Sequence, residues 1–157
     1  MSDTYPVVEL VRQALVSCLE AISVDAGYHI DVPKVHQPVR RGIDGMPGNY
    51  EIVVVQAAAE AAGEEAIGTE EFVQDFLVDL VVRPPDGEQK PFDQIANIFA
   101  ADVRKALHAD RTLGGVAIDT TAGPPEQLIG DEGTYDGVGL TVRCRYRTDA
   151  DDPYTQQ

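Results

Sequence analysis

A long stretch of alternating side chains, residues 71–83, constrains the fold of this chain more than any other part of it. The even-numbered positions are mostly large and apolar, and the odd-numbered ones carry acids and a base: Phe72, Phe76, Val78, Leu80 and Val82 against Glu71, Asp75, Asp79 and Arg83. A period of two over this length is typical of a β-strand with one face on a core. We therefore predict a strand that ends at the Pro-Pro-Asp-Gly turn of residues 84–87.

Two other segments predict strands that can pair with it. Residues 50–55 form a short β-branched run, typical of a strand covered on both faces. Residues 138–147 alternate apolar and polar side chains, with Val138, Leu140, Val142, Cys144 and Tyr146 against Thr141, Arg143, Arg145 and Arg147. The alanines between residues 56 and 70 allow either a longer strand or a helical turn. We expect a long hairpin with its tip near residues 63–69. Short strands are expected at 28–32 and 116–119.

Apolar residues at three- and four-residue spacing predict two amphipathic helices. They are Val8, Val11, Leu15, Leu19 and Ile22 in the first helix, and Phe92, Ile95, Phe99, Val103 and Ala106 in the second. The predicted order is α-β-β-β-α-β-β, with irregular loops at 33–48 and 121–136. This order indicates an α+β domain, residues 1–147, with a mixed, mostly antiparallel sheet and both helices on one face. Residues 148–157 read as an acidic polar tail, mobile unless a partner holds it.

The charge of the chain limits its partners. The 157 residues include 27 acids and 12 bases, a net charge of −15, which opposes tight binding to a nucleic-acid backbone or an anionic membrane. Such a surface still lets DNA slide past. Few lysines and many acids also suit high salt, so a halophilic host is a hypothesis. Without an apolar run of about 18 residues or a basic leader, we expect no membrane span and synthesis in the host cytoplasm.

Few residues of the sequence are candidates for catalysis or metal binding. His29, Asp31 and His36 could hold a metal ion, but their spacing fits no established motif, and polar surface residues are the stronger interpretation. Asp75 and Asp79 lie four strand residues apart, about 13 Å, which is too far for a glycosidase pair. We expect Cys18 and Cys144 to be buried thiols rather than a disulfide. The sequence predicts no catalytic residue, no metal and no cofactor.

Arginines interrupt the acidic background in two places. Arg143, Arg145 and Arg147 share one face of the last predicted strand, and Arg40 with Arg41 forms a second basic spot in a loop. The arginines of the strand can pair with acids in the same sheet, namely Glu71, Asp75 or Asp79. Alternatively, they can bind an acidic neighbouring subunit, with Asp75 and Asp79 as the matching acids. Nucleic-acid contact is a minor alternative.

The order of the elements resembles the tail terminator (tail completion, or minor tail) proteins of long-tailed phages, including the lambda-type terminator. The resemblance rests on the first helix, the strand at 50–55, the long alternating strand with its Pro/Gly turn, and the second helix. Two segments add to it: residues 110–115, Asp-Arg-Thr-Leu-Gly-Gly, and the ending at 142–148, Val-Arg-Cys-Arg-Tyr-Arg-Thr, followed by an Asp-Pro at 152–153. It covers most of the chain by pattern and order.

The resemblance implies a non-enzymatic virion protein that forms a hexameric ring. Such a ring caps the tail tube, stops its polymerisation and joins the tail to the head–neck connector, with DNA passing through the lumen. The implied partners are further copies of the chain, the tail tube protein and the connector, and the implied place is the tail or neck of the virion. The alternatives are another neck protein, such as a head–tail adaptor or stopper, and a cytosolic ligand-binding domain.

Overall fold

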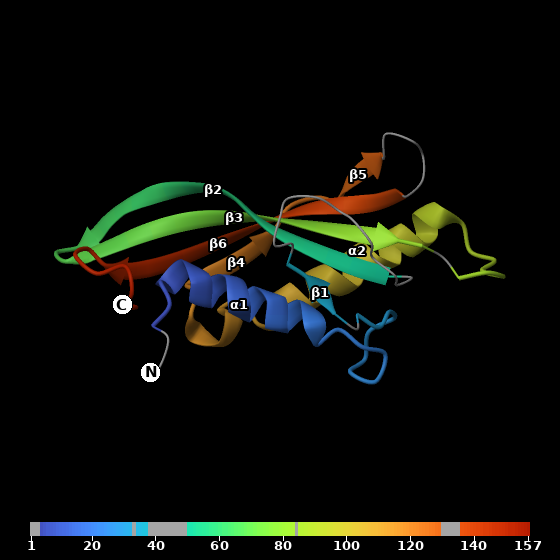
Figure 1. The fold of residues 1–157 in the computed structure, drawn as a ribbon, viewed down its shortest axis with the longest axis horizontal. Coiled ribbons are helices and arrows are strands. Elements are labelled where there is room, and N and C mark those ends of the chain that lie inside the picture. The colour runs from blue at the N-terminus through green and yellow to red at the C-terminus, as the bar shows by residue number, and fades with distance from the viewer. Residues whose placement is uncertain (1–3, 33, 38–49, 84, 130–135) are drawn as a thin grey trace.

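The computed structural model of the chain describes residues 4–32, 34–37, 50–83, 85–129 and 136–157, apart from the side chains of 63–66, 129 and 136. These residues form two α-helices and the six strands of one sheet, and three strands follow each helix along the chain (Figure 1). Their bounds are α1 Val7–Glu20, β1 Val35–His36, β2 Tyr50–Ala66, β3 Thr69–Val82, α2 Phe92–Ala109, the 3-10 turn Leu113–Gly115, β4 Asp119–Ala122, β5 Glu126–Ile129 and β6 Asp136–Asp149.

The sheet is built on three long antiparallel strands, β2, β3 and β6. The short strand β1 joins the outer edge of β2 in parallel, and β4 and β5 both pair with the other edge of β6. The sheet is therefore mixed and mostly antiparallel, which confirms the predicted α+β class. Gly137 lies opposite Val81 on β3, where a Cβ atom would approach the Leu80 carbonyl oxygen to 2.4 Å, so this crossing accepts only glycine.

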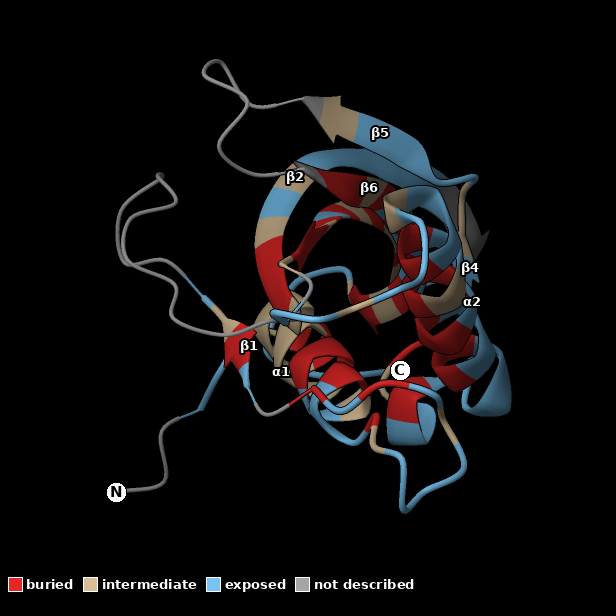
Figure 2. Ribbon diagram, turned by 90° about the vertical axis from the view of Figure 1, so that its right-hand side faces the viewer, coloured by how far each residue is buried: buried red, intermediate tan, exposed pale blue. Residues whose placement is uncertain are grey.

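The core lies between the sheet and the two helices, as Figure 2 shows by the buried residues along the inner side of the arched sheet. The even-numbered apolar residues of β3, such as Phe76 and Leu80, are fully buried against α1 and α2. Leu15 of α1 and Phe99 of α2 are equally buried. The predicted helical periodicity and strand alternation therefore both face one core. A smaller cluster of Val53, Val55 and Val81 lies on the outer face of the sheet.

The β2–β3 hairpin and the end of β6 extend beyond α1 at one end of the molecule (Figure 1). A bulge at Ala57 and Ala58 of β2 shifts the register between Gln56 and Ala59. The buried Gln74 donates hydrogen bonds to both bulge carbonyl oxygens, at 2.9 and 3.2 Å, and so compensates the broken ladder. Gly68, with φ of 84°, closes the tip, so the predicted long hairpin is confirmed.

Four predictions of individual elements are wrong in detail, and one of them is the irregular loop at 33–48, which contains the short strand β1. Residues 28–32 form a bend and irregular backbone instead of a strand, and the strand expected at 116–119 begins only at Asp119. The loop expected at 121–136 contains the end of β4 and all of β5. The tail folds back on the domain, because Val7 N–H donates to the Pro153 carbonyl oxygen at 3.0 Å and Gln156 binds the Gly115 carbonyl at 2.7 Å.

Candidate functional site

The arginine face of β6 lies on the outer side of the sheet, away from both helices. Cys144 and its even-numbered neighbours on β6 point into the core, so alternation directs Arg143, Arg145 and Arg147 outward. Their side chains are 53%, 46% and 33% exposed, respectively. The predicted one-sided arrangement of these arginines is therefore present, and the acids around them determine what it can do.

Arg143 binds Asp75, the residue directly opposite it on β3. Its Nε and Nη2 atoms donate to the two carboxylate oxygens at 2.9 and 3.1 Å. Such a two-pronged contact matches the planar guanidinium to the planar carboxylate. The hydrogen bonds that Arg143 donates to Asp75, followed by the negative charge of Asp75, raise the pKa of Arg143. Arg143 is thus neutralised within the chain.

Glu71 is buried under two arginines. Its side chain is only 2% exposed, and Arg145 donates to Glu71 Oε1 from Nε at 2.9 Å and also from Nη2. Arg147 Nε donates to the other carboxylate oxygen at 3.2 Å. A buried carboxylate of this kind is stable only while its partners remain, since removal of either leaves charge without compensation.

A fourth ion pair, between Arg111 and Asp119, extends this set of ion pairs to β4. Asp119 lies opposite Arg145 in the register, and it binds Arg111 through two hydrogen bonds of 2.7 and 2.8 Å. The hydrogen bond from Arg111 lowers the pKa of Asp119, and the charge of Arg145 adds to this effect. This pair was not predicted, because the pairing of β4 with β6 is not evident from the sequence.

Asp79 does not join the arginines. Gly139 lies opposite it on β6, and Val53 lies opposite it on β2, so no arginine faces it in the register. Burial raises the pKa of Asp79 above its ordinary value. The structure therefore corrects the expectation that Asp79 shares in the cross-strand pairing. Arg40 and Arg41, the second predicted basic spot, lie outside the described residues.

The ion pairs described above form an ordered layer of alternating charges on the outer face of the sheet. We call it the charged sheet face, defined by Glu71, Asp75, Asp119, Arg111, Arg143, Arg145 and Arg147. Pairing within the same sheet, one of the three sequence-based alternatives, accounts for the bonds from Arg143 to Asp75 and from Arg145 and Arg147 to Glu71. Contact with a neighbouring subunit stays a prediction, and the Arg143 and Arg145 side chains, 53% and 46% exposed, are accessible to one.

The candidate metal residues have separate partners. His29 Nδ1 lies 3.1 Å from Asp102 Oδ1, His36 pairs with Glu51, and Asp31 accepts the Val24 backbone N–H at 2.7 Å. Among the residues that the structure describes, no group of three or more His, Cys, Asp and Glu side chains gathers as a metal site. The two cysteines are free thiols: Cys144 is buried, with its pKa raised by burial to about 11, and Cys18 is half-buried.

Asp102 is a buried polar residue that the helical pattern of the sequence could have indicated. It lies on the core side of α2, only 2% exposed, and accepts the backbone N–H groups of His29 and Ile30 at 2.7 and 3.0 Å. Its position three residues after Phe99 and four before Ala106 places an acid on an apolar helix face. That pattern signals a buried carboxylate with a dedicated partner.

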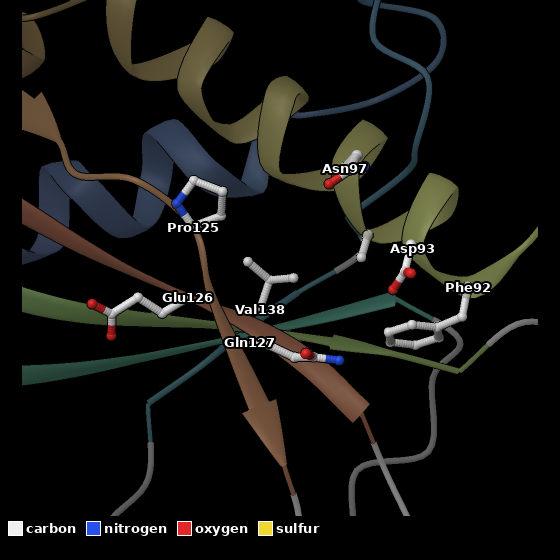
Figure 3. Close-up of a pocket in the computed structure, with 8 residues that line it drawn as sticks. Phe92, Asp93, Asn97, Pro125, Glu126, Gln127 and Val138 are labelled. Carbon is white, nitrogen blue, oxygen red and sulfur yellow. The ribbon is translucent and has the colours of Figure 1, made fainter.

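A shallow hollow of about 290 Å³ lies between the first turns of α2 and the corner that joins β4 to β5 (Figure 3). Asp93 and Asn97 reach it from α2, and Glu126 and Gln127 from β5. In Figure 3 the Glu126 side chain extends away from Asp93, so the two carboxylates do not point at a common centre. This arrangement offers hydrogen-bonding groups but lacks the convergence of an acid–base pair.

Comparisons with known proteins add no relative: no protein-family model matches the chain, and no curated protein matches it. Within the described part of the chain, no helix has both the length and the apolar character needed to cross a membrane.

Proposed function

We propose that the protein is a structural subunit of a virus tail, a tail terminator whose copies form a hexameric ring. In this role the ring caps the tail tube, stops its polymerisation and joins the tail to the head–neck connector. DNA passes through the lumen without sequence-specific binding. The tail tube protein and the connector are the partners on the two sides of the ring.

The observation that carries the proposal is the long antiparallel platform of β2, β3 and β6 with helices on one side only. The order of a helix, a long hairpin, a second helix and a final long strand is the pattern on which the resemblance to tail terminators rests. A platform that carries no helix on one face, among the described residues, and a protruding hairpin offer surfaces for other proteins, and such surfaces suit a subunit of an assembly.

The charge distribution supports passage of DNA rather than its capture. The arginines of the charged sheet face are already bound to Glu71, Asp75 and Asp119, so they offer little net positive charge to a phosphate backbone. The rest of the chain keeps the surplus of acids behind its net charge of −15. A lumen lined by such a surface repels DNA and leaves it free to move.

Mass measurement of the purified chain under native conditions tests the proposal. We expect a six-fold ring, or a monomer that becomes a six-fold ring only when tail tubes are added. A twelve-fold ring would identify a head–tail adaptor instead. A chain that remains monomeric with tubes, and leaves tube length unregulated in an assembly reaction, would contradict the proposal.

A further inference from the structure

One acid on the outer face of the sheet has no partner in its own chain. Asp79 is half-buried on β3, and within the described residues its carboxylate accepts no hydrogen bond and joins no ion pair. Burial alone raises its pKa, with no contribution from a bonded or charged neighbour. A carboxylate withdrawn from water without a partner destabilises the folded chain. Such local costs are expected where a side chain serves a function.

The groups around Asp79 are aliphatic. Val53 lies opposite it on β2 and is 4% exposed, and Val81, two residues further along β3, is 1% exposed. Gly139 lies opposite it on β6, where a Cβ atom would stand 3.4 Å from Asp79 Oδ1 and 3.3 Å from Leu128 Cδ2. We call this surface the Asp79 patch, defined by Val53, Leu77, Asp79, Val81 and Leu128.

The Asp79 patch fits a guanidinium group from another molecule. Leu77 is 43% exposed, so the patch is open on its outer side. A carboxylate among apolar side chains attracts a positive charge more strongly than a fully solvated one does, because the local dielectric constant is lower. A guanidinium group is more weakly hydrated than an ammonium group and can bind both carboxylate oxygens, so arginine is the better partner at such a place.

Arg104 is the matching cation on the chain itself. It is exposed on α2, and it has no side-chain hydrogen bond or ion pair, whereas the other arginines of the described residues all interact with a neighbouring group. The helices cover the inner face of the sheet and Asp79 lies on the outer face (Figure 2). Arg104 and Asp79 of one chain therefore lie on opposite sides of the domain and cannot meet.

We propose that Arg104 of one copy docks onto the Asp79 patch of the next copy, with its guanidinium group bound to the Asp79 carboxylate. The contact joins subunits of the proposed ring and rests on that proposal. Because the two surfaces differ, the contact is head-to-tail and leads to a closed ring where the rotation closes. It brings opposite charges together between chains whose net charge of −15 otherwise keeps them apart.

Replacement of the acid separates assembly from folding. Asp79→Asn removes a buried charge, so the fold should gain stability, and the lower net charge weakens general repulsion between copies. We nevertheless expect the concentration for half-assembly, followed by native mass measurement over a dilution series, to rise about tenfold or more, because a hydrogen-bonded charge pair is worth at least that factor. Asp86→Asn, in the exposed turn after β3, is the charge control. Equal assembly of the two variants would overturn the docking.

Replacement of the arginine should weaken assembly to a similar extent. Arg104→Gln changes an exposed helix position without a side-chain partner, so folding should stay unchanged. Lys90→Gln is the matched control, since it removes another exposed positive charge just before α2 and should leave assembly near that of the wild type. A larger loss of assembly for Lys90→Gln than for Arg104→Gln would assign the carboxylate to another cation and overturn the docking.

An exchange of charges between two variants tests the contact directly. Asp79→Lys and Arg104→Glu each place like charges at the contact, so neither variant alone should assemble at concentrations at which the wild type does. An equal mixture of the two should assemble, because every contact between unlike copies then joins opposite charges. Urea midpoints establish that both variants are folded. A mixture of folded variants that stays unassembled would overturn the docking.

The outcomes separate the contact from the ring. A six-fold ring in which Asp79→Asn and Arg104→Gln assemble like their controls supports the terminator function and overturns the docking. An assembly of two copies that depends on both residues supports the docking and contradicts the terminator function. A wild-type chain that stays monomeric even with tail tubes contradicts both.

Discussion

Arg143 and Asp75 face each other directly across the β3–β6 ladder and are joined by two parallel hydrogen bonds of 2.9 and 3.1 Å. Four residues further along β3, Asp79 faces Gly139 and has no such partner in the register. Two acids of one strand face therefore lie in opposite electrostatic environments. Their difference leads to the first prediction.

Replacement of Asp79 by asparagine should stabilise the fold at neutral pH, whereas Asp75→Asn should destabilise it. Burial raises the pKa of Asp79, so the folded chain binds this proton more tightly than the unfolded chain. Stability from this group is then present below the unfolded pKa, about 3.9, and is lost as the pH rises through the folded value. The gain of Asp79→Asn should accordingly vanish as the pH falls through the carboxyl range.

Urea midpoints between pH 3.5 and 8 measure this difference. Asp86→Asn is the control for the loss of one negative charge from an acidic chain, because Asp86 is exposed in the turn after β3. Asp79→Asn should gain more than Asp86→Asn at pH 7. Equal gains would show that overall repulsion, rather than the burial of Asp79, sets the effect.

The buried carboxylate of Glu71 should be among the most sensitive polar groups of the sheet. Glu71→Gln keeps the shape but presents an amide to two guanidinium groups, so we expect the free energy of unfolding to fall by about 3 kcal/mol. Glu70→Gln, one residue away, should change it by less than about 0.5 kcal/mol. Urea denaturation of both variants measures the contrast. A loss for Glu71→Gln as small as that of the control would mean that Arg145 and Arg147 do not depend on this carboxylate.

Much of this fold is readable in the sequence, because long elements repeat their signal many times. The alternation around Phe76 repeats over several residue pairs of the strand, and the spacing around Phe99 repeats over several turns of the helix. Both elements were therefore predicted correctly. β4 and β5 have four residues each and no clear alternation of apolar and polar side chains. They are strands because they pair with β6, and the local sequence does not indicate that pairing. At 28–32 the β-branched residues suggested a strand, but Asp102 takes the backbone N–H groups that a ladder would have used.

The candidate site was readable only in part. Alternation placed the β6 arginines on one face, but the choice between Asp75 and Asp79 as a partner depends on the register of β3 against β6. Register is set by the three-dimensional pairing and by glycines such as Gly137, and a slip of one residue would move every side chain to the other face. The alternation of side chains within either strand does not contain that information.

An exchange of charges between positions 75 and 143 separates pairing within the chain from contact between subunits. Arg143→Asp and Asp75→Arg should each lower the urea midpoint, and the double exchange should restore most of it, because the pair is re-formed with reversed polarity. At about 1 M salt the losses should shrink, since the Debye length is then about 3 Å. If the single variants fold as well as the wild type but fail to assemble, the arginine belongs to a subunit contact instead.

The Asp102 carboxylate fixes the turn that follows α1 through two backbone hydrogen bonds. Removal of this carboxylate should therefore destabilise that turn before the rest of the fold. Asp102→Ala leaves the N–H groups of His29 and Ile30 without an acceptor, so we expect a loss of about 3 kcal/mol in the free energy of unfolding. Asp93→Ala is the matched control, because it removes an exposed acid from the first turn of the same helix and should cost less than about 1 kcal/mol. Hydrogen exchange should show faster exchange of the His29 and Ile30 amides in Asp102→Ala alone. Unchanged protection of these two amides would show that the carboxylate does not hold the turn, whatever the change in global stability.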